Sequence, residues 1–298
     1  MKRIKEYIVS FFNGLCMALA DSVPGVSGGT IAFILGFYDE FIKSLDDLFR
    51  GDKKKKIEAL KFLGKIGIGW IFGFVLAILF LANLFETHIY EMSSLFIGFI
   101  VFALPIVIKE EKSALKGKYY NLFFAVLGAV FVAVISYLNG STSVSVNLNV
   151  LNLSTIIYTF LAGALAISAM ILPGISGSTI MLIFGIYLPI IAKIKDFLHF
   201  DFSTVPILTT LGLGIIFGIV VFTGFLRKLL EKRRSATVYA IIGMMLGSIY
   251  SIIAGPTTLT PALSMLSAET FNILFFILGG VIIFSVEGIK KFIEKNNK

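Results

Sequence analysis

The chain has 298 residues, of which 57% are hydrophobic and only 15% are charged, and its mean hydropathy is +0.94. Soluble domains usually carry more charge, and no stretch between the apolar runs is long enough to form a soluble core. The composition therefore excludes a soluble globular protein and predicts a polytopic membrane protein, whose formal net charge of +8 comes from lysines and arginines gathered in short segments.

The first predicted element is a re-entrant helical hairpin over 8–45. Its apolar arm, 8–20, would be about 20 Å long as a helix, too short for a hydrocarbon core of about 30 Å. The arm ends at 21-DSVPGVSGGT-30, where proline and glycines favour a sharp turn. Broken backbone is tolerated at membrane depth only where protein or a water-filled cavity surrounds it. A cleaved signal peptide is the alternative for this N-terminal region, but the same motif recurs in mid-chain.

The remaining elements follow in two sets. A second hairpin is predicted at 156–192, around 172-LPGISGST-179, and its first arm is longer, so a hairpin that spans the membrane twice is the alternative there. Windows of about 20 apolar residues predict membrane-spanning helices. Three of them precede the second hairpin and three follow it, at 64–85, 92–108, 120–138, 207–226, 237–254 and 271–289.

The two sets are related by an internal repeat. A shift of 149 residues superimposes the two Pro-Gly motifs and also Gly36 on Gly185. A shift of 145 aligns GxGxIFG at 67–73 with GxGxIFG at 212–218, and a shift of 151 aligns Asn121 and Gly128 with Asn272 and Gly279. The matches keep their order, which predicts one membrane domain made of two repeats, 8–138 and 156–289.

The positive charges then orient the chain. All but two of the lysines and arginines lie in 1–7, 43–65, 109–118, 227–234 and 290–298. Basic residues mark cytoplasmic loops, so both termini and the 43–63 loop are predicted to be cytoplasmic, with 139–155 outside. Each half has an odd number of spans, which makes the repeats inverted. The predicted fold is an all-α polytopic membrane protein with two inverted-topology repeats, each a re-entrant helical hairpin plus three transmembrane helices.

The two motifs are the candidate anion site. Each is predicted to open a half-helix whose free amides and partial positive charge attract anions, and two such ends would meet near the midplane, as in inverted-repeat transporters. The alternative is that serine and threonine merely cap the helices and glycine merely packs. The candidate substrate-binding residues are Ser22, Pro24, Gly25, Ser27, Gly28, Gly29, Thr30, Pro173, Gly174, Ser176, Gly177, Ser178 and Thr179.

Three charged residues have predicted roles beside this site. Asp21 lies at a hairpin tip, where a buried charge is costly and usually functional, and we expect it to couple transport to a proton or a sodium ion. The alternative is a cap on its own loop. Lys193 and Lys195 are the only basic residues that the topology places outside, and they are candidates for substrate capture. Interfacial snorkelling is the alternative for both lysines.

The sequence shows no motif typical of an enzyme or of a metal site. We find no metal-ligand cluster, Walker loop, HExxH motif or nucleophile–base pair. Cys16 is the one cysteine, which excludes an internal disulfide framework. The glycine pairs Gly69/Gly73 and Gly214/Gly218 have the small-xxx-small spacing of packed membrane helices. We therefore predict a protein that is not an enzyme and that uses no cofactor, no metal and no nucleic-acid partner.

The two motifs, 21-DSVPGVSGGT-30 and 172-LPGISGST-179, resemble those of the PopT-type polyprenyl-phosphate transporters of bacteria, and the resemblance covers nearly the whole chain. It implies a flippase of the bacterial cell membrane that returns undecaprenyl phosphate from the outer to the cytoplasmic leaflet for reuse in cell-wall and surface-polymer synthesis. The phosphate would lie at the hairpin tips while the prenyl tail stays in lipid. The alternatives are a transporter or channel for a small soluble anion and a non-transporting scaffold, against which the lack of a sizeable soluble domain argues.

Overall fold

The computed structural model describes residues 2–22, 27–77, 87–141, 148, 152–258 and 261–295, and these ranges contain helices and no strands. Short 3-10 turns lie at Tyr119–Asn121, Phe202–Thr204 and Gly255–Thr258. The α-helices, in chain order, are α1 (Lys2–Asp21), α2 (Gly28–Ile34), α3 (Tyr38–Arg50), α4 (Lys53–Leu76), α6 (Ile89–Glu110), α7 (Lys112–Leu115), α8 (Leu122–Ser141), α9 (Leu153–Ile171), α10 (Gly177–Ile183), α11 (Tyr187–Leu198), α12 (Val205–Lys232), α13 (Arg234–Ala254) and α14 (Ile273–Lys295).

Six helical segments in the described ranges are long and apolar enough to cross a membrane, which confirms an all-α polytopic membrane protein. They contain α4, α6, α8, α9, α12 and α13. This set differs from the predicted one at two places. The first arm of the second hairpin, α9, qualifies, whereas the apolar part of α14, Ile273–Gly288, is shorter than the others. The helices α10 and α11 are bent by 107° at the break between them, and they count as a seventh span only if taken together.

The charged segment 43–63, predicted as a loop, is mostly helical. It contains the end of α3 and the start of α4, separated by Gly51 and Asp52. The side chain of Asp52 caps α4 by accepting a hydrogen bond of 2.9 Å from the N–H of Lys55. Lysine, glutamate and leucine are good helix formers, so the positive charges mark where the polar region begins rather than where the helix ends. The C-terminal part of the predicted 64–85 span lies outside the described residues.

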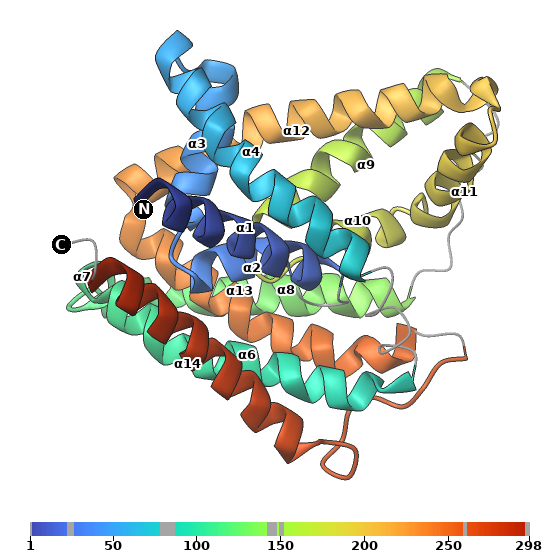
Figure 1. The fold of residues 1–298 in the computed structure, drawn as a ribbon. Coiled ribbons are helices and arrows are strands. Elements are labelled where there is room, and N and C mark those ends of the chain that lie inside the picture. The colour runs from blue at the N-terminus through green and yellow to red at the C-terminus, as the bar shows by residue number, and fades with distance from the viewer. Residues whose placement is uncertain are drawn as a thin grey trace.

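The helices pack in four main pairs: α1 with α4, α9 with α12, α6 with α14, and α8 with α13. In Figure 1 the α9–α12 pair lies at one edge of the molecule and the α6–α14 pair at the opposite edge, with the remaining pairs between them. The N-terminal part of α1, the C-terminal part of α14 and the short helix α7 lie at the same end of the molecule (Figure 1).

The α1–α4 and α9–α12 pairs share the same close backbone contacts. Gly69 lies against the backbone of Phe11, and Gly214 lies against the backbone of Phe160. Each contact sits where a side chain would collide with the neighbouring carbonyl, which is how small residues let membrane helices approach. The glycines are 145 residues apart and the phenylalanines 149, the offsets found in the sequence.

The other two pairs match in the same way. Gly98 of α6 lies against the backbone of Phe276 in α14, and Gly243 of α13 lies against the backbone of Ala125 in α8. Here each pair joins the two halves of the chain, because α6 and α8 come from the first half and α13 and α14 from the second. The halves are therefore interlocked through their last two long helices rather than packed as separate bodies.

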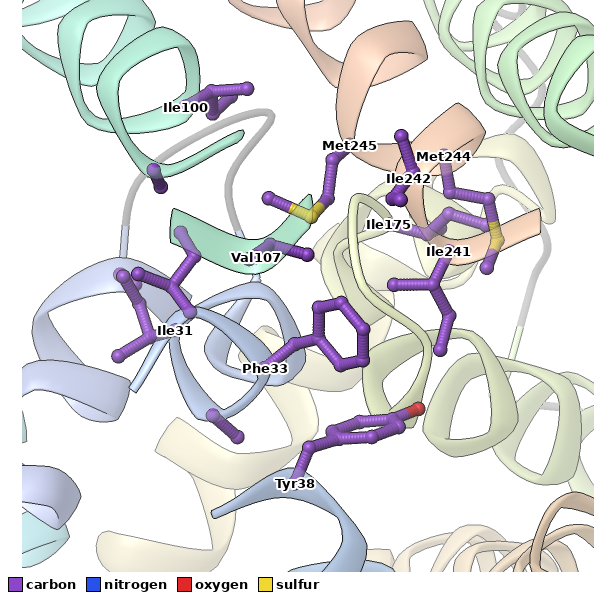
Figure 2. Close-up of a cluster of buried hydrophobic side chains, with 14 of the residues drawn as sticks. Ile31, Phe33, Tyr38, Ile100, Val107, Ile175, Ile241, Ile242, Met244 and Met245 are labelled. Atoms are coloured by element: carbon purple, nitrogen blue, oxygen red, sulfur yellow. The ribbon is translucent and has the colours of Figure 1, made fainter. Parts of the chain in front are cut away.

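The hydrophobic core lies where the two hairpins meet α6 and α13. Figure 2 shows Phe33 and Tyr38 of the first hairpin beside Ile175 of the second motif and Met245 of α13. The rings of Phe33 and Tyr38 pack edge to face, with centroids 5.6 Å apart. In contrast, α4, α8 and α12 leave most of their apolar side chains on the outside, as helices in contact with lipid do. The broken segments are thus enclosed by protein, which their backbone requires.

Candidate functional site

The first motif forms a helix break between α1 and α2. Ser27 caps α2 with an extended backbone, and its hydroxyl accepts a hydrogen bond of 3.2 Å from the N–H of Thr30. The side chains of Ser27 and Thr30 are fully buried. Two of the predicted site residues, Pro24 and Gly25, lie outside the described residues. The hydroxyl of Ser22 donates to the carbonyl of Ala18, so this residue closes the last turn of α1.

Asp21 directs its carboxylate to the start of α2. One oxygen, Oδ1, accepts a hydrogen bond of 2.6 Å from the N–H of Gly28. The other, Oδ2, accepts one of 3.2 Å from the indole N–H of Trp70, whose ring stacks on Phe74 with centroids 5.1 Å apart. The carboxylate therefore fills the position at α2 that the sequence analysis assigned to a bound anion.

Sequence reasoning missed Trp70. It is the only tryptophan of the chain, and it follows one of the tightly packed glycines, Gly69. Its rarity is the only signal in the sequence, because nothing in the motif spacing shows which residue of α4 faces Asp21. Only the packing of α1 against α4 brings the two together.

The second motif forms a similar break between α9 and α10, with different polar contacts. Ser176 precedes α10 with an extended backbone but makes no side-chain cap. Its hydroxyl instead lies 2.7 Å from the hydroxyl of Ser178. Ser176 is buried, while Ser178 and Thr179 are half-buried. Within the described residues no hydrogen-bond partner is found for the Thr179 hydroxyl.

The structure brings the two motifs into direct contact. The N–H of Gly174 donates to the hydroxyl oxygens of Thr30 and Ser27, at 2.8 and 3.1 Å. The hydroxyl of Ser27 donates to the carbonyl of Leu172 at 3.1 Å, and Tyr38 donates to the carbonyl of Ile171 at 3.1 Å. Sequence reasoning expected the two motifs to meet, but it did not identify Tyr38 as one of the residues that join them.

A cavity of about 360 Å³ begins beside Asp21. It lies among α1, α3, α4, α9 and α12, and its lining includes Leu45, Trp70, Ile167 and Ile219. In the part of the lining that the structure describes, Asp21 is the one charged residue. The cavity is bordered by three span-length helices and has mainly apolar walls, which suit hydrocarbon better than water or a free anion.

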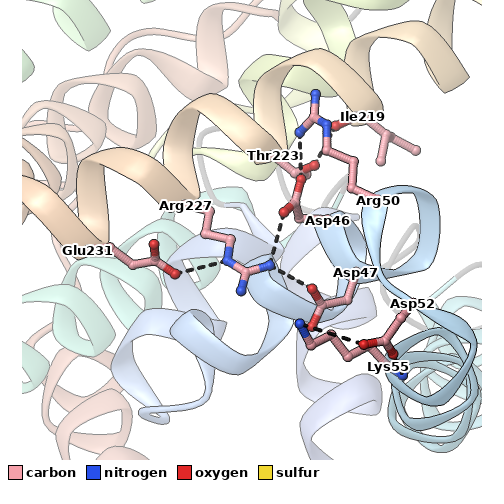
Figure 3. Close-up of polar contacts among 9 residues, drawn as sticks. All are labelled: Asp46, Asp47, Arg50, Asp52, Lys55, Ile219, Thr223, Arg227 and Glu231. Carbon is pink, nitrogen blue, oxygen red and sulfur yellow. Dashed lines mark hydrogen bonds and ion pairs between the residues drawn. The ribbon is translucent and has the colours of Figure 1, made fainter.

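Two groups of ion pairs join the halves at the end of the molecule where α7 lies. Arg227 of α12 contacts Asp46 at 3.0 Å and Asp47 at 2.6 Å, and both carboxylates are buried (Figure 3). Arg234 of α13 contacts Asp39 and Glu111, both at 2.5 Å. The two aspartates of the first group belong to α3, so the first hairpin is tied to the second half through charged groups at its base.

The predicted capture lysines lie on α11, after the bend that separates this helix from the second motif. Lys193 pairs with Asp196 at 3.8 Å and also lies near Asp201. Hydrogen bonds from Ser203, with a smaller contribution from Lys193, lower the pKa of the Asp201 carboxyl. Carboxylates therefore offset the charge of Lys193, whereas Lys195 is exposed.

Metal ligation has no visible basis in the described part of the chain. No group of three or more histidine, cysteine, aspartate or glutamate side chains there is arranged to hold a metal ion. The chemistry of this site consists of hydroxyls, one carboxylate and an apolar cavity.

The sequence match that identifies the family includes both motifs and the residues that line the cavity. A family model described as undecaprenyl phosphate translocase-like matches residues 17–268. The chain belongs to this family. Among its relatives is a polyprenyl-phosphate transporter of Vibrio cholerae serotype O1, 32% identical over 261 residues, which cover 83% of this chain and 78% of the relative. A polyprenyl-phosphate transporter of Staphylococcus aureus is 34% identical over 257 residues, covering 84% and 87%. No solved structure shows significant similarity to the chain.

Proposed function

We propose that this protein is a flippase for undecaprenyl phosphate or a related polyprenyl phosphate. It would return the lipid from the outer to the cytoplasmic leaflet of the bacterial cell membrane, for reuse in cell-wall and surface-polymer synthesis. The observation that carries this proposal is the meeting of two Pro-Gly motifs inside a bundle of span-length helices, next to a cavity with apolar walls. The names of the Vibrio and Staphylococcus relatives support the choice of substrate.

The proposed phosphate site is the second motif. Ser176, Ser178 and Thr179 offer hydroxyls at the start of α10, and the hydroxyl of Thr179 has no partner in the described structure. Hydrogen bonds to a charged group are worth about 1.5–3 kcal/mol, enough to hold a phosphate against water. Hydroxyls of the first motif already bind protein groups, so substrate contacts there remain a prediction. The same holds for Ser22, Pro24, Gly25, Gly28, Gly29, Pro173 and Gly177, and for capture by Lys193 and Lys195.

The proposed architecture is a pair of inverted-topology repeats, 8–138 and 156–289, each with a re-entrant hairpin. The recurrence of the Gly69–Phe11 contact as Gly214–Phe160 supports it. In inverted-repeat transporters, substrate sites lie at the repeat interface near the midplane, and here the two motifs meet at that interface.

Asp21 is the proposed coupling residue. An ionised carboxylate close to the phosphate would repel it, and a bound proton or sodium ion would remove that repulsion. Asp21 borders both the contact between the motifs and the cavity. A cation at Asp21 and a phosphate at the second motif would then each affect the binding of the other.

A proteoliposome assay tests the proposal. Purified protein would be reconstituted with a fluorescent polyprenyl phosphate, and movement between leaflets would be followed with a membrane-impermeant quencher. We expect protein-dependent movement that excess inorganic phosphate does not inhibit. Inhibition by inorganic phosphate, together with uptake of labelled phosphate into the vesicles, would instead support a transporter of small soluble anions.

A further inference from the structure

The backbone of 171–174 is held by three side chains of the first hairpin. The N–H of Gly174 donates to two hydroxyl oxygens, at 2.8 Å to Thr30 and 3.1 Å to Ser27. The carbonyl of Leu172 accepts from Ser27, and the carbonyl of Ile171 accepts from Tyr38. The three side chains are fully buried, so these bonds have no competition from water. Two consecutive carbonyls and one amide of 171–174 are thus satisfied by side chains of the first hairpin.

These contacts use the bonding capacity of the Ser27 hydroxyl. A serine hydroxyl has one hydrogen to donate and two lone pairs. Its hydrogen goes to Leu172, and its oxygen accepts from the N–H groups of Gly174 and Thr30. The Thr30 hydroxyl oxygen accepts from Gly174 and lies 3.1 Å from the Ser27 oxygen. The Ser27 hydroxyl therefore retains no donor for a phosphate oxygen.

Close backbone packing fixes the same segment from both sides. Gly174 has φ +91°, and a Cβ there would lie 2.5 Å from the carbonyl oxygen of Met244 in α13. On the opposite side, a Cβ on Gly29 would lie 2.6 Å from the carbonyl oxygen of Ile171. Real side chains do not approach so closely, so α2 and α13 enclose 171–174 only because both positions are glycine. α10 begins three residues after Gly174, at Gly177.

We propose that Ser27, Thr30 and Tyr38 are positioning residues for the second motif. They fix the backbone of 171–174 and thereby set where Ser176, Ser178 and Thr179 stand at the start of α10. The first motif acts on substrate through the second, and its glycine at position 29 serves the approach of a protein backbone rather than of a ligand. This inference rests on the proposed function in so far as the second motif binds the substrate phosphate.

Hydrogen–deuterium exchange of the substrate-free protein tests the contact itself. We expect the amide of Gly174, measured in peptides covering 172–179, to exchange roughly tenfold faster or more in Ser27→Ala/Thr30→Val, because a buried N–H loses both acceptors. Thr30→Ser keeps an acceptor oxygen at position 30, so the Gly174 amide should exchange about as slowly in this variant as in the wild type. If the double variant does not fold, Thr30→Val and Thr30→Ser as single variants carry the same comparison.

A matched control separates this local effect from general loosening. Ser136 and Ser251 form an interhelical hydroxyl pair elsewhere in the bundle, between α8 and α13. Ser136→Ala/Ser251→Ala should leave exchange at 172–179 unchanged. Unchanged exchange there in Ser27→Ala/Thr30→Val would overturn the proposal, and so would an equal increase over the whole chain.

Transport measurements then separate positioning from direct binding. The initial rate at limiting substrate would be compared among Ser27→Ala/Thr30→Val, Ser176→Ala/Ser178→Ala and the variant with all four changes. If Ser27 and Thr30 act through the second motif, changing them should add little to the loss of transport rate caused by changing Ser176 and Ser178. If they are independent ligands, the two fold-losses in rate should multiply. Multiplied losses would overturn the proposal. If wild-type protein moves no polyprenyl phosphate, the proposed function fails, and the exchange experiment still decides the inference.

Discussion

At the scale of single residues, the Asp21 carboxylate both binds protein groups and borders the cavity. Both of its oxygens accept hydrogen bonds, from Gly28 and from Trp70, and the same carboxylate borders the cavity. We predict that Asp21→Asn still binds polyprenyl phosphate but loses the dependence of transport on the proton or sodium gradient, because an amide neither titrates nor attracts a cation. Binding and gradient-driven transport would be measured on one preparation.

The structure also predicts that Asp21→Asn lowers the stability of the protein. An amide has one acceptor oxygen, so its NH₂ group would face one of the two N–H donors that Asp21 now satisfies. Leaving such a donor unpaired costs about 1–3 kcal/mol, and thermal stability should fall accordingly. Trp70→Phe removes one donor and is the matched control, since Asp21→Asn should cost less stability in that background. Gradient dependence equal to wild type in Asp21→Asn would show that Asp21 serves only as a cap.

The second-motif hydroxyls allow a separate prediction. Ser176→Ala/Ser178→Ala/Thr179→Ala should lower affinity for polyprenyl phosphate, by roughly ten- to a hundredfold per lost hydrogen bond to a charged group. The readout is the half-saturating substrate concentration in the proteoliposome assay. Thr210→Ala is the control, because within the described residues the Thr210 hydroxyl has only the carbonyl of Pro206, in its own helix, as a hydrogen-bond partner. Affinity equal to wild type in the triple variant would exclude these hydroxyls as ligands.

How far the sequence predicts the site depends on which contacts are local. The pattern around Pro24 and Pro173 indicates two helix breaks with hydroxyls behind them, and α2 and α10 begin where it places them. The partners of those hydroxyls cannot be predicted this way. Trp70 and Tyr38 reach the motifs only through packing between helices, which motif spacing does not encode.

At the scale of helices, paired glycines provide a test with a built-in control. Gly69 lies against the backbone of Phe11, whereas Gly67, two residues before it in the same GxG pattern, has nothing within 4 Å of where a Cβ would stand. We predict that Gly69→Ala lowers the melting temperature, because overpacking costs about 1–3 kcal/mol. Gly67→Ala should be neutral or slightly stabilising, since alanine favours helix over glycine by up to about 1 kcal/mol.

The second half of the chain offers the same comparison between a packed and an open glycine. Gly214 lies against Phe160, and Gly212 is open in the same way as Gly67. Gly214→Ala should therefore destabilise while Gly212→Ala does not. Equal effects of the packed and open glycines would contradict the helix packing seen in both halves.

The ion pairs of Arg227 allow a second test at this scale. Arg227→Gln removes the only ion-pair partner that the described structure gives to Asp47, whose carboxylate is buried. Breaking a buried pair from one side costs about 3–5 kcal/mol, so we expect a clear loss of thermal stability. Lys55→Gln is the control, because the Lys55–Asp52 pair is exposed and spans 3.9 Å, and such pairs are worth about 0–1 kcal/mol.

Charge neutralisation should reverse part of this loss. Adding Asp47→Asn to Arg227→Gln removes the unpaired carboxylate, so the double variant should be more stable than Arg227→Gln alone. A double variant less stable than the single one would mean that Arg227 acts by packing rather than by charge.

The sequence predicts the existence of most helices and misses some of their ends. Hydropathy indicates the spans that become α6, α8, α12 and α13. It misses the helical start of α4, because four consecutive lysines lower the hydropathy below that of a span, although they fit the polar end of a helix that begins at the Asp52 cap. Helix formation follows local propensity and capping, while membrane depth follows hydropathy, so a boundary predicted from hydropathy falls inside the helix.

At the scale of the whole molecule, the two halves share contacts as well as residues. Gly128 lies against the backbone of Ala240, and Gly279 lies against the backbone of Leu95, at the offsets of 151 and 145 residues that relate the halves in sequence. A chance resemblance between two hydrophobic sequences would not reproduce both partners of a contact. Equivalent packing on both sides of the motif contact would let the molecule open toward either side at similar cost, which a flippase requires.

The distribution of positive charge leads to a prediction about orientation in the membrane. Basic residues gather at 1–7, 43–65, 109–118, 227–234 and 290–298. The parts of these segments that the structure describes include α7 and the outer ends of α1 and α14, which lie at one end of the molecule (Figure 1). Since lysine and arginine are retained on the cytoplasmic side, we predict that this end is cytoplasmic and that the segment 261–270 is outside.

Single cysteines measure this orientation directly. Lys54 lies at the start of α4, and Glu269 is exposed shortly before α14. In a Cys16→Ala background, an impermeant thiol reagent added to intact cells should label Glu269→Cys and leave Lys54→Cys unlabelled until the cells are opened. The two positions serve as each other's control for expression and reactivity. Labelling of Lys54→Cys from outside would reverse the orientation, and labelling of both from outside would exclude the inverted repeat, because the predicted number of crossings between the two positions is odd.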